Sequence, residues 1–154
     1  MKIAIAGDSV GIELASVLCA HVATLPGMSV ANLSAASDGR EERYAEIAER
    51  VCRAILAGEF ERGILCCGTG IGMAMSANKV PGIRAAQTHD SFSAERAAKS
   101  NDAHVVTLGA RVVGTELAKT IVSVWLASHF DPAGPSAGNV EAITTLERKY
   151  RSVI

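Results

Sequence analysis

The chain has 154 residues, of which 49% are hydrophobic and 20% charged, and its formal net charge at pH 7 is −1. These values suit one globular domain with a hydrophobic core, and we predict a single domain over residues 1–154. Because basic residues are not in excess, neither nucleic acid nor an anionic membrane is expected as a partner. The first apolar run, Ile3–Ala6, is too short for a signal-peptide core or a membrane span, so a cytoplasmic location is expected.

Short apolar runs alternate with longer amphipathic stretches along the chain. In chain order, this pattern predicts the strand Lys2–Ala6, a helix through Leu14–Val22, the strand Met28–Leu33, the helix Glu42–Ala57, the strand Arg62–Cys67, the helix Met73–Lys79, the strand Ile83–Gln87, the helix Ser91–Ser100, the strand His104–Leu108, the helix Glu116–Ser128 and the terminal helix Val140–Tyr150. The strands are apolar throughout, which is typical of strands covered on both faces. The pattern therefore predicts a three-layer α/β sandwich with a five-stranded parallel sheet and a C-terminal helix.

Ligands of open parallel sheets bind beyond the carboxyl ends of the strands, so the residues that follow each predicted strand are candidates for a site. The polar ones are in Gly7-Asp8-Ser9, Cys67 to Gly72, Thr88-His89-Asp90 and Gly109-Ala110-Arg111. The segment Ser100-Asn101-Asp102 precedes the fifth strand, so this rule does not place it at the same edge.

The glycine-rich turn Gly68-Thr69-Gly70-Ile71-Gly72 follows the third strand. Glycines at alternate positions let backbone N–H groups converge on an anion at the start of a helix. The turn is not a G-x-x-x-x-G-K-[ST] phosphate loop, and its third glycine comes one position early for G-x-G-x-x-G. A dinucleotide-binding domain stays open as an alternative, because Asp90 lies about where a ribose-binding acid would fall. The place of the turn after the third strand, and the lack of a second domain, argue against it.

The chain has four cysteines and no C-x-x-C pair: Cys19, Cys52, Cys66 and Cys67. Free thiols in a reducing compartment are expected. Side chains alternate along a strand, so Cys66 faces away from Cys67, and we interpret Cys66 as a small buried hydrophobe. Cys67 ends its strand directly before the glycine-rich turn, whose N–H groups favour a thiolate. From these residues alone, a catalytic and a structural Cys67 are equally supported.

Seven segments carry a family resemblance: Gly7-Asp8, Ile64 to Gly72, Ala77-Asn78-Lys79, Gly82-Ile83-Arg84, Ser93-Ala94, Asn101-Asp102 and Gly109 to Gly114. Together they resemble the ribose-5-phosphate isomerase B and galactose-6-phosphate isomerase family over nearly the whole chain. The resemblance implies a Rossmann-like αβα fold and an aldose–ketose isomerase that works through an enediol, without a metal or another cofactor. It also implies a homodimer or tetramer whose active sites are shared between subunits.

The resemblance also implies roles for the residues that match the family's motifs. Cys67 matches the base that moves a proton between C1 and C2 of a sugar phosphate, and Thr69 is the second catalytic residue. The cradle for the enediolate oxygens would be formed by Gly68, Thr69, Gly70, Ile71 and Gly72. Further substrate contacts would come from Asp8, Asn101 and, near the phosphate, Arg111.

The chain departs from the family at a histidine after the first strand, at a ring-opening histidine and at two phosphate-binding arginines. These positions are here Ser9, Ser100 and about Pro135 and Asn139. We still expect Ser9, Ser100 and Asn139 to line the substrate site. A tetrose 4-phosphate cannot close a furanose, since its O4 carries the phosphate, so it needs no ring-opening acid. The departures therefore favour D-erythrulose 4-phosphate and D-erythrose 4-phosphate, with ribose 5-phosphate and ribulose 5-phosphate as the alternative.

Three short segments, Ala6–Ser9, Thr88–Asp90 and Ser136–Val140, also resemble the tetrose-phosphate branch of the family, D-erythrulose-4-phosphate isomerase. His89 is the remaining candidate acid near the strand ends, against the plainer interpretation of a surface histidine in a loop. Arg40, in the loop after the second strand, is a further candidate for the phosphate. Two other classes of function stay open, a non-catalytic subunit and a nucleotide-binding module.

Overall fold

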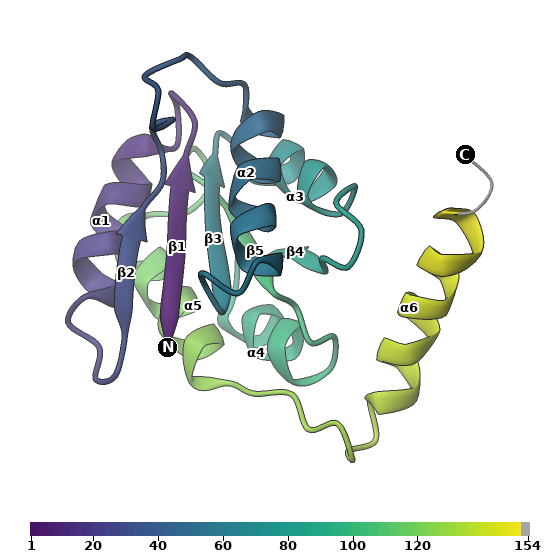
Figure 1. Ribbon diagram of the computed structural model, residues 1–154. Coiled ribbons are helices and arrows are strands. Elements are labelled where there is room, and N and C mark those ends of the chain that lie inside the picture. Colours follow the sequence, from purple (N-terminus) through teal and green to yellow (C-terminus); the bar gives the residue numbers. More distant parts are fainter. Residues whose placement is uncertain (152–154) are drawn as a thin grey trace.

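The structure is a computed structural model that describes residues 1–151, and it contains five parallel strands with helices on both faces of the sheet (Figure 1). The strands are β1 (Lys2–Gly7), β2 (Ser29–Asn32), β3 (Arg62–Cys67), β4 (Ala85–Gln87) and β5 (Val105–Gly109). The helices are α1 (Ile12–Val22), α2 (Tyr44–Leu56), α3 (Ile71–Ala77), α4 (Ser91–Lys99), α5 (Thr115–Ala127) and α6 (Ala137–Arg151). Across the sheet the order is β2-β1-β3-β5-β4. The predicted three-layer, Rossmann-like sandwich is confirmed. The predicted single domain over 1–154 extends past the described residues and stays a prediction.

Two separate apolar clusters fill the spaces between the sheet and its helices. Ile3 and Ile5 pack with α1, α4 and α5 on one face, where Trp125 is fully buried. Ala4 and Ala6 pack with α2 and α3 on the other face. This division follows from the two-residue period of a strand. Close packing on both faces holds the ends of the central strands in fixed relative positions.

The outer strands differ from the prediction that all strands are apolar and buried. β1, β3 and β5 are almost entirely buried, whereas β2 is half-exposed and β4 has three residues in place of the five expected. An outer strand has a neighbour on one side only, so part of its surface meets solvent. The apolar residue Ile83 is buried but lies in the turn before β4, where its backbone N–H donates to the carbonyl of Val80.

Helix α3 begins and ends two residues earlier than predicted. Gly70 has φ +80°, a left-handed conformation that turns the chain directly from the glycine-rich loop into the helix. At the other end, the Asn78 side chain donates to the carbonyls of Ala74 and Ala85 and accepts the N–H of Ala85. These bonds end α3 and tie it to the start of β4.

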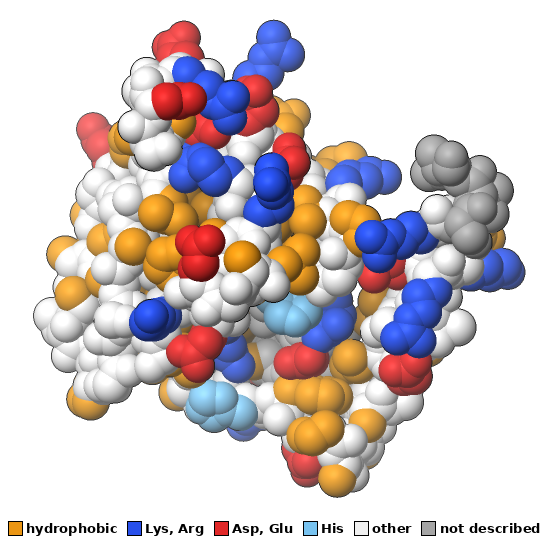
Figure 2. All heavy atoms as spheres, in the orientation of Figure 1, with side chains coloured by type: hydrophobic (Ala, Val, Ile, Leu, Met, Phe, Trp, Pro, Cys, Tyr) orange, Lys and Arg blue, Asp and Glu red, His pale blue; other side chains and the backbone are white. Residues whose placement is uncertain are grey.

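The terminal helix α6 stands beside the sheet and is reached through a long connecting segment (Figure 1). Among its described side chains only Val140 is buried, and Glu147 accepts a hydrogen bond from the N–H of Gly82 at 2.8 Å. Ile143, Leu146 and Tyr150 are exposed. Within residues 1–151, no helix combines the length and apolar character needed to cross a membrane. Basic and acidic side chains are interspersed on the face shown in Figure 2.

Candidate active site

The carboxyl ends of β1, β3 and β5 lie side by side and bring three of the predicted segments together. Gly7 pairs with Cys66, and Cys67 pairs with Gly109. Just beyond the strands, the N–H of Asp8 donates to the carbonyl of Cys66 at 3.1 Å, and the N–H of Ala110 donates to that of Cys67 at 2.8 Å. The turn after β1 and the turn after β5 therefore flank Cys67 on its two sides.

Cys67 and Cys66 differ in their surroundings, although they are adjacent in the chain. The Cys67 side chain lies on the α2–α3 face, is 5% exposed, and its Sγ accepts the N–H of Gly70 at 3.1 Å. This contact holds the sulfur against the start of the glycine-rich loop. Cys66 is fully buried on the opposite face, and burial raises the pKa of its thiol. Cys66 is therefore an inert apolar side chain, as the sequence predicts.

The glycine-rich loop rests on the end of β5. A Cβ at Gly109 would lie 2.7 Å from the carbonyl carbon of Thr69, so the two backbones approach too closely for a side chain. Within residues 1–151, no hydrogen bond uses the backbone N–H groups of Gly68, Thr69 and Gly72. These three donors are free to bind an anionic oxygen next to Cys67.

Asp8 and Ser9 line a hollow of about 400 Å³ between the ends of β1 and β2 and the start of α2. The Oδ1 of Asp8 accepts the N–H groups of Val10 and Gly11 at 3.0 and 2.9 Å. Its Oδ2 forms no hydrogen bond with any described residue, which leaves that oxygen for a hydroxyl of a ligand. Arg40 also lines this hollow, but it is ion-paired with Asp38 and Glu42.

Arg111 lies against the glycine-rich loop from the β5 side. Its N–H donates to the carbonyl of Gly68 at 3.0 Å, and its side chain is in van der Waals range of the space beside Gly68. The residue is exposed, so its guanidinium is available to a phosphate in the same solvent-facing region. The structure therefore brings Arg111, Asp8, Cys67 and the loop to one edge of the sheet.

Ser100, Asn101 and Asn139 are not brought to this edge. Asn101 follows α4 and its carbonyl accepts the Nε of Arg84 at 3.1 Å, next to the amino end of β5. That end pairs with Gly63, four residues before Cys67, so it lies about 13 Å along the sheet from the thiol. Asn139 lies in α6, on the far side of β4. The sequence could not place these residues, because they do not follow a strand.

His89 lies at the predicted edge, just after β4, but one of its ring nitrogens already accepts a hydrogen bond from the backbone. Its Nε2 accepts the N–H of Gly109 at 3.0 Å, so in this tautomer the ring proton is on Nδ1. Only Nδ1 could then donate a proton to a ligand. In the described residues, no three His, Cys, Asp or Glu side chains are grouped to hold a metal ion. The expected absence of a metal or cofactor stays a prediction.

Three residues near the site were missed by sequence reasoning. The ring of Tyr44 lies over Gly72, where an added Cβ would be 2.9 Å from its Cε2. Gln87 donates from Nε2 to the carbonyl of Thr69, and Thr107 donates from Oγ1 to the carbonyl of Gly70. Of the three, Thr107 could have been identified from the sequence, because a hydroxyl inside an otherwise apolar buried strand needs a hydrogen-bond partner.

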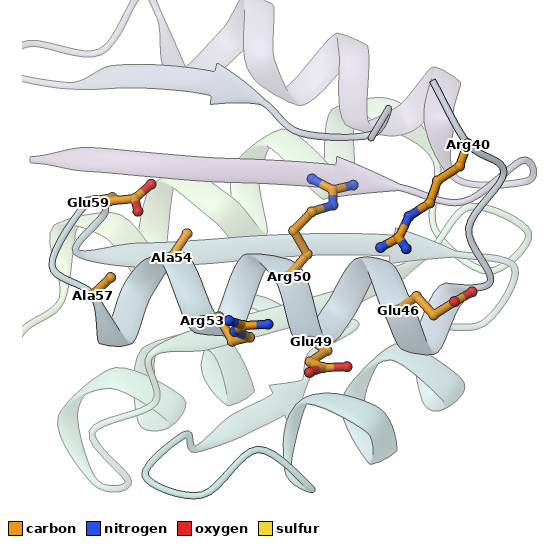
Figure 3. A pocket seen from close by; sticks show the side chains of 8 residues that line it. All are labelled: Arg40, Glu46, Glu49, Arg50, Arg53, Ala54, Ala57 and Glu59. Carbon is orange, nitrogen blue, oxygen red and sulfur yellow. The ribbon is translucent and has the colours of Figure 1, made fainter. Parts of the chain in front are cut away.

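A larger hollow of about 550 Å³ runs along α2, away from Cys67 (Figure 3). Arg40 enters it from the loop before α2, whereas Arg50 and Arg53 come from the helix itself. Glu46, Glu49 and Glu59 also line it. Arg50 is ion-paired at 2.5 Å with Glu42, which lies outside the lining. The charges that line this hollow are balanced, and neither Cys67 nor the glycine-rich loop lines it.

Comparison with known proteins gives concordant results. The sequence pattern of the family described as Ribose/Galactose Isomerase matches residues 3–143. The chain is 46% identical to D-erythrulose-4-phosphate isomerase of Pectobacterium atrosepticum, over 98% of both chains. It is 44% identical to ribose-5-P isomerase B of Listeria innocua, over 98% of this chain and 100% of that one. Its fold matches ribose-5-phosphate isomerase B of Clostridium thermocellum with a TM-score of 0.88 and 38% identity, over 97% of this chain and 99% of the other.

Proposed function

Because this chain belongs to the ribose/galactose isomerase family, we propose that it interconverts D-erythrulose 4-phosphate and D-erythrose 4-phosphate, with Cys67 as the base. The chain is an aldose–ketose isomerase of a sugar phosphate, as are its relatives. The observation that carries the assignment of the base is the hydrogen bond from the N–H of Gly70 to the Sγ of Cys67, beside loop N–H groups that bond to none of residues 1–151.

Proton transfer between two neighbouring carbons needs one base and one set of anion-binding donors. The Cys67 thiolate takes the proton from the carbon beside the carbonyl, and the electron pair of that C–H bond becomes the C1–C2 double bond. Negative charge moves to the carbonyl oxygen, where the N–H groups of Gly68, Thr69 and Gly72 stabilise the enediolate. The Cys67 thiol then returns its proton to the other carbon while a hydroxyl proton moves between O1 and O2. These reaction steps use no metal or cofactor.

The tetrose substrate is supported by two serines that stand where the family resemblance implies histidines. A ring-opening acid is needed for a furanose such as ribose 5-phosphate, and the chain has Ser100 at the position of the family's histidine. Ser9 likewise stands where the family has a second histidine. D-erythrulose 4-phosphate is open-chained, since its O4 carries the phosphate, so serine hydroxyls that bind the sugar are sufficient. Ribose 5-phosphate is the second candidate, since a relative named for it is 44% identical.

The proposal includes a homodimer or tetramer with shared active sites. Cys67 and Asn101 lie at opposite edges of the sheet within one chain, and Asn139 lies on α6, also away from Cys67. A second copy of the chain would therefore supply Ser100, Asn101 and Asn139 to each Cys67. The exposed apolar side chains of α6 are consistent with such packing. The four free cysteines are consistent with a cytoplasmic location.

The substrate is tested by measuring kcat/KM of the purified chain on D-erythrulose 4-phosphate and on ribose 5-phosphate. We expect the tetrose to be preferred by tenfold or more, about 1.4 kcal/mol in transition-state binding. Ser100→His is the matched variant and should shift the ratio toward ribose 5-phosphate. A tenfold preference of the unchanged chain for ribose 5-phosphate would contradict the tetrose assignment. Failure to isomerise any sugar phosphate without a second protein would instead support a non-catalytic subunit.

A further inference from the structure

One peptide group in the glycine-rich loop is hydrogen-bonded at both of its ends. This peptide joins Thr69 to Gly70, and its N–H donates to the Sγ of Cys67 at 3.1 Å. Its carbonyl oxygen, which belongs to Thr69, accepts the Nε2 of Gln87 at 2.7 Å. A donor on the carbonyl of a peptide polarises that peptide and makes its N–H a better donor. The Gln87 amide is thus linked to the Cys67 sulfur through a single peptide group.

The next peptide along the loop is held by a second side chain. Thr107 of β5 donates from Oγ1 to the carbonyl of Gly70 at 2.8 Å, and this residue is fully buried. Gly70 itself has φ +80°, and an added Cβ would lie 3.1 Å from the backbone of Leu108. The peptide groups before and after Gly70 are therefore both anchored, one from β4 and one from β5. Anchoring on both sides holds the Gly70 N–H in its direction toward the sulfur.

We propose that Gln87 and Thr107 are positioning residues for the catalytic thiolate, acting through the backbone on either side of Gly70. The proposal rests on the role of Cys67 as the base. Neither side chain touches the substrate in this scheme. Gln87 strengthens the Gly70 N–H as a donor, and Thr107 sets its direction. Together they hold the Gly70 N–H, and with it the Cys67 sulfur, in a fixed position relative to the substrate carbons.

The test compares Gln87→Met and Thr107→Val, each of which removes one donor with little change in shape. Thr107→Ser is the conservative variant, since it keeps the hydroxyl. Thr120→Val is the control, because the Thr120 hydroxyl also donates to a backbone carbonyl, that of Glu116 at 3.1 Å, on helix α5. Two quantities are measured for each variant. The first is the rate of Cys67 alkylation by iodoacetamide at neutral pH, followed by peptide mass spectrometry. The second is the pair of steady-state constants, kcat and KM.

For Gln87→Met and Thr107→Val we expect alkylation of Cys67 at neutral pH to slow by about three- to tenfold, the effect of one hydrogen bond. The kcat should fall by a similar factor while KM changes less than twofold. Thr107→Ser and Thr120→Val should behave as the unchanged protein does.

Unchanged alkylation and kcat in Gln87→Met would overturn the role of Gln87. The side chain of Gln87 is exposed, so this variant tests the proposal even if Thr107→Val does not fold. Equal losses in Thr107→Ser and Thr107→Val would show that Thr107 acts by packing and would overturn its positioning role. Full activity of Cys67→Ala would instead remove the base assignment. Alkylation of Cys67 needs no turnover. Failure of the positioning roles is therefore distinguishable from failure of the base assignment.

Discussion

Arg84 and Asp102 form an ion pair that holds the turn between α4 and β5. The Nε of Arg84 also donates to the carbonyls of Asn101 and Asp102, at 3.1 and 2.9 Å. Asp102 has φ +46° and is the one non-glycine residue within 1–151 with positive φ. The backbone N–H groups of Asp102 and Ala103 close the end of α4 on carbonyls of its last turns. The turn that carries Ser100 and Asn101 is therefore rigidly built, although it lies away from Cys67 in the same chain.

The backbone of this turn predicts an ordering of two variants at position 102. Asp102→Gly loses the ion pair but adopts positive φ without steric cost. Asp102→Ala loses the same pair and also places a Cβ in the left-handed region, which costs about 1 kcal/mol. We therefore expect Asp102→Ala to have the lower free energy of unfolding, by about that amount. Urea unfolding monitored by circular dichroism measures it. Equal stability of the two variants would show that the conformation at 102 carries no strain.

Replacement of the proposed base predicts a loss confined to the chemical step. Cys67→Ala should lower kcat by about 10²- to 10⁴-fold, the usual contribution of a general base, with little change in KM. The control is Cys19→Ser, since Cys19 is a free thiol on α1, and burial raises its pKa to about 11. Steady-state kinetics with a coupled assay measure both variants. An unchanged kcat in Cys67→Ala would contradict the assignment of the base.

The shared site predicts that two inactive variants restore each other. Cys67→Ala damages the site on one edge of the sheet, and Asn101→Ala damages the contribution made from the other edge. In mixed dimers one of the two sites then receives both intact residues, so about a quarter of the unchanged activity is expected after co-refolding of equal amounts. Each variant refolded alone is the control. If the site lay within one chain, every site in the mixture would carry a defect and no activity would return.

The half-buried imidazole of His104 predicts a dependence of stability on pH. Burial, and then the nearby Arg84 guanidinium, lowers the pKa of His104 below its ordinary value of 6.5, against a smaller opposing effect of Asp102. Its Nδ1 accepts the N–H of Arg84 at 3.1 Å, a bond that requires the neutral ring. Below pH 6.5 the unfolded chain therefore binds a proton that the folded chain does not, and the free energy of unfolding falls as pH is lowered further.

Urea unfolding at pH 7, 6 and 5 measures this slope, and His104→Asn is the matched variant. An asparagine amide oxygen can replace Nδ1 as the acceptor but does not titrate. The slope between pH 7 and 5 should therefore be smaller in the variant. The hydrogen bond to Arg50 lowers the pKa of Glu42 below its ordinary value of 4.5. Carboxylates of this kind therefore change the free energy of unfolding only below pH 4.5, outside the range measured here. Identical slopes in both proteins would assign the effect to other groups.

Local patterns predicted the strands that carry the candidate site, because such patterns act over a few residues. The apolar runs of β1, β3 and β5 identify strands with both faces covered, and their carboxyl ends carry Asp8, Cys67 and Arg111. The alternation of a strand likewise separates Cys66 from Cys67. The bounds of α3 were missed, because they depend on the left-handed Gly70 and on the Asn78 side chain bonded to β4.

By itself, the sequence determined that a cysteine ends the third strand, that a glycine-rich turn follows it and that the fold is a parallel sandwich. Only the tertiary structure decided what each of these groups contacts. It places Asn101 at the opposite edge from Cys67, occupies the Nε2 of His89 with Gly109, and joins Gln87 to the loop beside Cys67. The physical reason is that these hydrogen bonds join segments far apart in the chain. They depend on the strand order β2-β1-β3-β5-β4, which the periodicity of residues along a chain does not encode.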